Sequence, residues 1–203
     1  MTQERTLEIL KTGANVFLTG EPGSGKTHVI NRYIAWLEAA GLNVAVTAST
    51  GIAATHIGGM TIHSWSGIGI KDSLSPQDLD AISTREKIVK RAKNAHVLVI
   101  DEISMLDGKV LDMVDQVLRT VRQKPEAFGG LQVVVVGDFF QLPPVTRQGD
   151  MMRYAFESNA WLNLKPLVCY ITEQYRQEDE MLLGLLASIR KNAIEEDHYT
   201  LLQ

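Results

Sequence analysis

The sequence predicts an α/β fold, in which a mostly parallel β-sheet carries helices on both faces. Short apolar runs rich in β-branched residues recur along the chain, at 16–18, 44–46, 97–100, 133–136 and 167–171. Runs that are apolar at successive positions are typical of strands covered on both faces, as in parallel sheets. Helical patterns lie between these runs, and such an alternation of strands and helices favours a doubly wound sheet.

The helical patterns appear as apolar residues three or four positions apart. They are Ile30, Ile34 and Leu37 within a helix expected over 26–39, then Val110, Val114, Val117 and Val121, then Leu182, Leu185, Leu186 and Ile189. The least regular stretch, 67–83, is rich in glycine, serine, aspartate and proline. We interpret it as a solvated connection formed by a loop or a short helix.

Size and composition indicate one domain over residues 1–203. The chain has 20 basic and 24 acidic residues, and its net charge of −4 argues against an obligate nucleic-acid binder without excluding a locally basic groove. The single Cys169 lies in an apolar run, so we expect a buried thiol and a reducing compartment. Since no apolar stretch of about 18 residues occurs, we expect an intracellular protein without a membrane partner.

A phosphate-binding motif, G-x-x-x-x-G-K-[ST], occupies residues 20–27, between an expected strand at 15–19 and the helix over 26–39. Glycines let successive backbone N–H groups turn inward toward phosphates, and the helix N-terminus adds favourable partial charge. Lys26 would reach the β- and γ-phosphates of ATP, and the Thr27 hydroxyl would ligate Mg²⁺. The alternative is a chance match in a glycine-containing turn. The predicted contact residues are Gly20, Gly23, Ser24, Gly25, Lys26 and Thr27.

Two carboxylates, Asp101 and Glu102, follow the apolar strand 97–100. The carboxyl ends of strands are where ligands of such folds bind. Asp101 would hold Mg²⁺ through its water shell, and Glu102 would orient and deprotonate the attacking water. The alternative is a polar strand end that faces solvent.

A third strand, 131–136, continues into residues 137–145. A neutral amide just beyond a central strand can hydrogen-bond the γ-phosphate or the attacking water, so Gln141 is the candidate nucleotide sensor. The alternative is that Pro143 and Pro144 simply form a rigid turn. Later, Tyr175 offers a flat face for a base and Arg176 a planar fork for phosphate oxygens. Taken alone that segment is weak, and a helix-capping salt bridge is the alternative for Arg176.

These four elements, in this order, resemble motifs I, II, III and IV of superfamily-one helicases, and more narrowly the Pif-one family of DNA helicases. Gln3 stands where the family has its adenine-reading glutamine. Residues 47–54 and 58–65 are similar to the two family motifs that contact single-stranded DNA. Residues 104–132 resemble the family's signature region, although Ala127 stands where a proline commonly precedes Phe128-Gly129-Gly130.

The resemblance implies a RecA-like P-loop NTPase fold and a role for each matched position. Lys26 and Thr27 would bind phosphate and Mg²⁺, Asp101 the metal, Glu102 the water, Gln141 and Arg176 the γ-phosphate, and Gln3 and Tyr175 adenine. Thr50, Gly51, Thr61, His63 and Ser64 would face single-stranded DNA. Small hydroxyl residues at strand-to-helix junctions can bind a phosphate backbone without reading bases.

Trp65 is the candidate for stacking on a base, an interaction worth about 1–3 kcal/mol. Its alternative role is a core anchor, and the alternative for His63 is a capped or buried histidine.

The expected function is ATP-driven translocation on single-stranded DNA and duplex unwinding, with the family's 5′-to-3′ polarity. We expect a second RecA-like domain, absent from this chain, to supply an arginine across the ATP cleft, so the isolated chain should bind ATP but hydrolyse it poorly. The alternatives are a P-loop ATPase switch that regulates a protein partner and a small-molecule nucleotide kinase. The expected compartment is the cytoplasm for a bacterial source and the nucleus or mitochondrion for a eukaryotic one.

Overall fold

The computed structural model describes residues 1–145, 151–173 and 188. A six-stranded sheet, in which every pairing is parallel, forms its centre in the order β3-β2-β4-β5-β1-β6. The strands are β1 (Val16–Gly20), β2 (Val44–Ala48), β3 (Met60–Thr61), β4 (Val97–Asp101), β5 (Gln132–Val136) and β6 (Leu167–Ile171). The carboxyl ends of all six strands therefore meet at one edge of the sheet, which is the edge where ligands of such folds bind.

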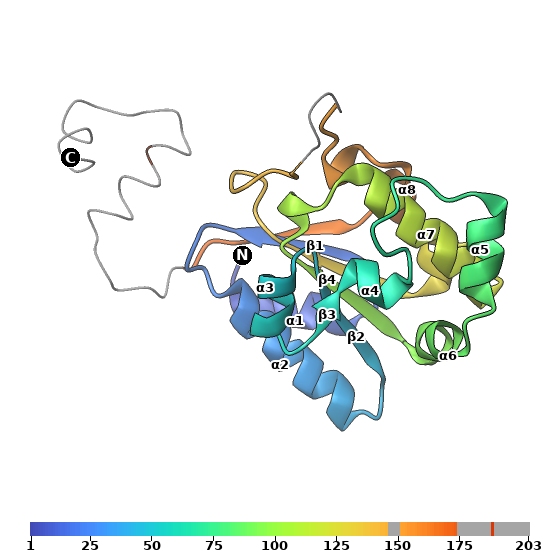
Figure 1. The fold of residues 1–203 in the computed structure, drawn as a ribbon. Coiled ribbons are helices and arrows are strands. Elements are labelled where there is room, and N and C mark those ends of the chain that lie inside the picture. The colour runs from blue at the N-terminus through green and yellow to red at the C-terminus, as the bar shows by residue number, and fades with distance from the viewer. Residues whose placement is uncertain (146–150, 174–187, 189–203) are drawn as a thin grey trace.

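Helices cover both faces of the sheet (Figure 1). One face carries α1 (Gln3–Lys11) and α2 (Lys26–Ala39), and the other carries α4 (Ile62–Ser66), α5 (Pro76–Ser83), α6 (Glu86–Asn94), α7 (Gly108–Arg122) and α8 (Asn159–Leu164). Successive residues of a strand enter opposite cores: Val97 and Val99 pack under α1 and α2, whereas Leu98 and Ile100 pack under the other layer. Two cores explain why the strands are apolar at every position rather than at alternate ones.

The predicted fold class is confirmed, and the helix expected over 26–39 is α2. The apolar repeat at 110–121 lies in α7. Within 67–83, Ser75 caps α5 through a capping box with Asp78, so the short-helix interpretation holds for its second half. The repeat at 182–189 lies outside the described residues, apart from Ser188.

Strand β6 departs from the expectation that each strand is covered on both faces. Leu167 and Val168 are 53% and 62% exposed, while Cys169 is 1% exposed, as predicted for a core thiol. The reason is that β6 is an edge strand with β1 as its neighbour. Sequence pattern alone does not reveal strand order, and so it could not identify the edge.

The signature segment forms a left-handed turn directly before β5. Phe128, Gly129 and Gly130, in the short helix η2 (Ala127–Gly130), have φ angles of 51°, 60° and 72°. A Cβ on Gly129 would lie 2.7 Å from the Leu118 carbonyl oxygen, so only glycine fits there. Phe128 is fully buried and accepts this strained conformation as part of the core.

Side chains of α7 hold that turn. The Asp115 carboxylate accepts the Phe128 N–H at 2.6 Å and pairs with Arg119 at 2.8 Å. Arg122 donates to the Gly129 carbonyl at 2.7 Å and to the Ala92 carbonyl at 2.6 Å, which joins the turn to the end of α6. The signature region thus fixes how β5 enters the sheet.

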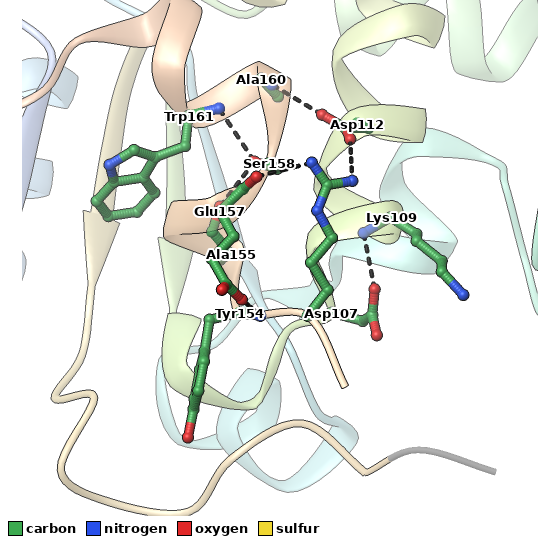
Figure 2. A network of polar contacts seen from close by, with 10 residues as sticks. Asp107, Lys109, Asp112, Tyr154, Ala155, Glu157, Ser158, Ala160 and Trp161 are labelled. Atoms are coloured by element: carbon green, nitrogen blue, oxygen red, sulfur yellow. Dashed lines mark hydrogen bonds and ion pairs between the residues drawn. The ribbon is translucent and has the colours of Figure 1, made fainter. Parts of the chain in front are cut away.

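A second network joins the first turns of α7 to the segment that precedes β6 (Figure 2). The Asp112 carboxylate accepts the Ala160 N–H at 2.8 Å and pairs with Arg153 at 2.9 Å. Ser158 caps α8 by accepting the Trp161 N–H at 3.1 Å. Through these contacts α7 holds both η3 (Ala155–Glu157) and α8 against the sheet.

In the part of the chain that the structure describes, every helix is too short or too polar to cross a membrane.

Candidate nucleotide site and nucleic-acid motifs

The phosphate loop joins β1 to α2 at the carboxyl edge of the sheet. Gly23 and Gly25 adopt φ angles of 83° and 87°, which turns the backbone into the left-handed region before the helix begins. Lys26 Nζ donates to the carbonyl oxygens of Gly20 at 2.8 Å and Glu21 at 3.2 Å. The ammonium group therefore lies against the loop, in the position from which a lysine can reach bound phosphates.

Gln3 packs on the back of this loop. Its side chain is buried and Nε2 donates to the Ser24 carbonyl at 3.0 Å, while its backbone N–H donates to the Glu173 carboxylate at 2.7 Å. A Cβ on Gly25 would lie 2.0 Å from Gln3 Nε2, so this glycine is required by close approach as well as by its φ angle. Gln3 thus links α1, the phosphate loop and the end of β6, and its contact with adenine stays a prediction.

The two acidic residues end β4 in an unusual conformation. Glu102 has φ 52° and ψ 46°, and its N–H donates to Asp101 Oδ1 at 2.9 Å. A left-handed conformation costs a non-glycine residue about 1–2 kcal/mol, and such outliers concentrate at functional sites. Here the conformation is the link between the strand and the short helix η1 (Ile103–Met105).

Burial and neighbouring charges perturb both carboxyl groups. Burial raises the pKa of Asp101, against the lowering effects of the Glu102 N–H and of Lys26. Burial also raises the pKa of Glu102, the charges of Asp101 and Asp138 raise it further, and Lys26 lowers it. Lys26, Asp101, Glu102 and Asp138, which are distant in sequence, therefore lie close enough to share one electrostatic environment. A raised pKa makes Glu102 a stronger base than an ordinary glutamate.

A cavity of about 550 Å³ opens beside these carboxylates. Thr27, Asp101 and Glu102 line one side, and α3 (Gly51–His56) lines the other. In the described residues there is no cluster of three or more histidine, cysteine or acidic side chains that would hold a metal by itself. Thr27 and Asp101 instead supply a hydroxyl and a carboxylate, a donor set that suits Mg²⁺ because this ion usually keeps several waters and binds substrate phosphates.

Gln141, the candidate sensor, follows β5. Its backbone N–H donates to the Asp138 carbonyl at 2.9 Å, and its exposed amide donates to the Asp138 carboxylate at 3.4 Å. Asp138 is 1% exposed and also accepts the Phe140 N–H at 3.1 Å. Sequence analysis missed Asp138, whose carboxylate both orients the sensor loop and raises the pKa of Glu102. An acid two residues after a buried strand was the available signal.

Tyr175 and Arg176 lie outside the described residues, so their expected contacts with adenine and γ-phosphate stay predictions.

The two predicted DNA motifs share one local design. Thr50 caps α3 by accepting the Ala53 N–H at 3.2 Å, and Thr61 caps α4 by accepting the Ser64 N–H at 3.2 Å. Thr50 lies two residues after β2 and Thr61 is the last residue of β3, so both lie at the carboxyl edge of the sheet, and Gly51 and Ser64 are exposed. The caps explain the threonines structurally, and each hydroxyl keeps its own O–H as a donor for a phosphate.

Trp65 does not fit the stacking role expected for it. It is 5% exposed and belongs to the core under α4 to α8, so the core-anchor alternative fits its burial. His63 is half-buried, and burial lowers its pKa. It lines a cavity of about 520 Å³ together with Thr61, Ser64 and Lys109. Lys109 is a cationic neighbour of this motif that sequence analysis did not identify.

Comparisons with known proteins agree with this geometry. A family model described as PIF1-like helicase matches residues 4–185. The chain is 56% identical over 180 residues to the ATP-dependent DNA helicase Pif1 of Psychrobacter sp. (strain PRwf-1), covering 88% of this chain and 27% of that protein. It resembles the crystal structure of Pif1 helicase from Candida albicans with a TM-score of 0.89 and 35% identity, over 97% of this chain and 45% of that one.

The crystal structure of Pif1 helicase from Bacteroides in complex with ADP-AlF3 and ssDNA matches with a TM-score of 0.85 and 32% identity, over 99% of this chain and 48% of that one. The chain thus spans about a quarter of the matched Psychrobacter protein and slightly under half of each of these two solved chains.

Proposed function

Because the chain belongs to the PIF1-like helicase family, we propose that it is the first RecA-like motor domain of an ATP-dependent DNA helicase. The observation that carries the proposal is that Thr27, Asp101 and Glu102 line one cavity, with Lys26 on the adjoining phosphate loop close enough to both carboxylates to lower their pKa. The similar Pif1 structure from Bacteroides, in complex with ADP-AlF3 and ssDNA, supports a nucleotide and single-stranded DNA as the two ligands.

The proposed chemistry distributes hydrolysis over the residues at the carboxyl edge. Lys26 would exchange its carbonyl partners for the β- and γ-phosphates, and Thr27 and Asp101 would hold Mg²⁺, which would supply neutralisation of phosphate charge. Glu102 orients the attacking water and accepts its proton, for which its raised pKa suits it. The family resemblance assigns the γ-phosphate to Gln141 and Arg176 and adenine to Gln3 and Tyr175, of which Tyr175 and Arg176 lie outside the described residues.

The proposed DNA path crosses the same edge of the sheet, over Thr50, Gly51, Thr61, His63 and Ser64. Helix α3 lines the cavity that contains Glu102, so one short helix faces both ligands. We place a second RecA-like domain of the same parent protein on this edge, because translocation needs two bodies whose separation depends on the nucleotide. The compartment would be the one that holds the DNA substrate, and the family's 5′-to-3′ polarity is carried over with the proposal.

Nucleotide binding tests the first half of the proposal. Lys26→Ala should weaken the affinity for Mg²⁺-ATP by roughly ten- to hundred-fold, since hydrogen bonds to charged groups contribute about 1.5–3 kcal/mol. The measurement is calorimetric titration of the chain, with Lys11→Ala on the exposed face of α1 as the matched control. Equal affinities of wild type and Lys26→Ala would contradict the site.

Titration with fluorescent oligothymidine at several salt concentrations tests the second half. Binding that weakens as salt rises supports a DNA motor, since counterions are released on binding. Tight nucleotide binding without any DNA binding would favour the alternative, an ATPase switch for a protein partner. Fast DNA-stimulated turnover by this chain alone would contradict the need for a second domain.

A further inference from the structure

The outward face of α6 is strongly basic in a chain that is acidic overall. The net charge of the protein is −4, yet residues 85–93 hold five basic residues against one acidic residue. Arg85, Lys87, Lys90 and Lys93 are all exposed. Ile88 and Ala92 are buried against the core, and at 100° per residue Lys87, Lys90 and Lys93 point away from that side of the helix. We call these four exposed residues the α6 basic face.

Within the described residues, no ion pair joins Arg85, Lys87, Lys90 or Lys93 to a carboxylate, and Glu86 is the single acidic residue of this segment, which keeps a net positive charge. The ion pairs of the described residues involve basic residues outside α6. These are Arg5, Arg32, Lys71, Arg119 and Arg153. Like charges at helical spacing repel one another, as Lys87 and Lys90 do, and the single Glu86 offsets only part of this repulsion. A negatively charged ligand bound to this face would relieve the repulsion between its basic side chains.

The fifth basic residue, Arg91, fixes the position of α6. It is partly buried and donates through Nη2 to the Ser64 carbonyl oxygen of α4, and its Nη1 lies 3.6 Å from the sulfur of Met60 in β3. Helix α6 therefore packs beside α4, the helix that carries Ser64, and reaches β3 through Arg91 (Figure 1). Lys87 lies one helical turn before Arg91, so the α6 basic face adjoins the motif that contains Ser64.

We propose that the α6 basic face is a second DNA contact, which binds the phosphate backbone of the segment that continues past Thr61 and Ser64. This inference rests on the proposed function. Lysine ammonium groups on flexible stems bind phosphates as point charges and carry no sequence information, which suits a motor that meets any sequence. The large apolar side chains of α6 face the core, so this face contacts the backbone and does not stack bases.

The test compares two double variants of the chain, Lys87→Gln/Lys90→Gln on α6 and Lys11→Gln/Lys165→Gln on other exposed positions. For each, the affinity for oligothymidine and for a duplex with a thymidine tail is measured against salt. Each lost phosphate contact lowers the slope of log K against log salt by about 0.7 for a single strand and about 0.9 for duplex. For the α6 variant, the magnitude of this slope should fall by about 1.4 with a single strand or by about 1.8 with duplex. The control should keep the wild-type slope.

Comparison of the two DNA substrates shows which part of the DNA contacts the α6 basic face. A reduced slope with oligothymidine itself puts single-stranded DNA on α6, and a reduced slope only with the tailed molecule puts the duplex arm there. Charge reversal, Lys87→Glu/Lys90→Glu, should weaken binding further than neutralisation does. Thermal melting curves of all variants show whether each one is folded, as expected for exposed positions.

Unchanged slopes in both substrates would overturn the inference while the proposed function stands. Failure of the wild type to bind either DNA would overturn the proposed function and this inference together. The inference would also be overturned if the α6 variant bound DNA like the wild type but no longer bound an acidic peptide such as polyglutamate. That result would assign the α6 basic face to a protein partner.

Discussion

Glu102 and Phe128 are both bulky residues with positive φ, and they stand at opposite ends of the sheet. Glu102 follows the carboxyl end of β4, with φ 52°, and Phe128 precedes the amino end of β5, with φ 51°. Phe128 is fully buried, and Asp115 accepts its N–H. Glu102 is only partly buried, its carboxylate lines a cavity, and its pKa is raised. The same backbone strain thus serves packing at one end and prepares a reactive group at the other.

The two ends differ in how their polar groups are satisfied. At the amino end, Gln132 accepts the Tyr33 hydroxyl at 2.8 Å and donates to the Leu10 and Ala14 carbonyls at 3.0 and 2.8 Å. At the carboxyl end, within the described residues, the buried hydroxyls of Ser24, Ser49 and Ser104 have no hydrogen-bond partner. Buried polar groups are normally paired, and three of the four unpaired side-chain atoms in the described residues lie at this edge, the fourth being Nε of Arg91 on α6, so the edge has polar groups available for a ligand.

The largest effect that would sharpen this comparison is expected from Glu102→Gln. Loss of a general base costs about 10²–10⁴ in rate, whereas nucleotide affinity should persist because Lys26 and Thr27 remain. The measurement is single-turnover ATP hydrolysis with oligothymidine present, alongside calorimetric binding.

The same variant should be more stable than the wild type at neutral pH without ligand. The folded-state pKa of Glu102 is raised, so wild-type stability falls as pH rises above the ordinary glutamate pKa of about 4.3, and glutamine removes that loss. The stability difference should shrink as pH approaches that value from above. If Glu102→Gln lowered both the hydrolysis rate and the melting temperature at pH 7, Glu102 would have a structural role like that of Phe128.

A smaller effect is expected at the other end, from Asp115→Ala. This change leaves the buried Phe128 N–H without an acceptor and Arg119 without its partner, which should lower the free energy of unfolding by about 1–3 kcal/mol. Urea unfolding measures this, with Asp80→Ala on the exposed face of α5 as the control. Nucleotide affinity of the folded variant should stay unchanged. A loss of nucleotide affinity comparable to that of Lys26→Ala would show that the two ends are not separate in function.

The functional end was easier to predict from sequence than the structural end. Lys26, Asp101 and Glu102 stand next to strands and within short motifs, so local patterns identify them. The acceptor for Phe128 is Asp115, thirteen residues earlier on another element, and it becomes visible only once α7 packs beside the turn. The two alternatives for Trp65 stayed open for the same reason, because the face that α4 buries depends on the helices packed around it. The exposure of β6 likewise follows from strand order, which is not a local property.

The smallest effect concerns Thr50, where structure and function meet in one hydroxyl. Its oxygen accepts the Ala53 N–H, while its hydrogen is free to bind a phosphate, so a single group can cap α3 and contact DNA. Thr50→Ala should lower stability by about 1 kcal/mol through loss of the cap and should also weaken oligothymidine binding. Thr50→Ser keeps both functions, whereas Thr50→Asp keeps the cap but brings a negative charge to the phosphates. If Thr50→Asp matched the wild type in stability and in DNA affinity, Thr50 would be a cap alone, and the DNA path would not cross α3.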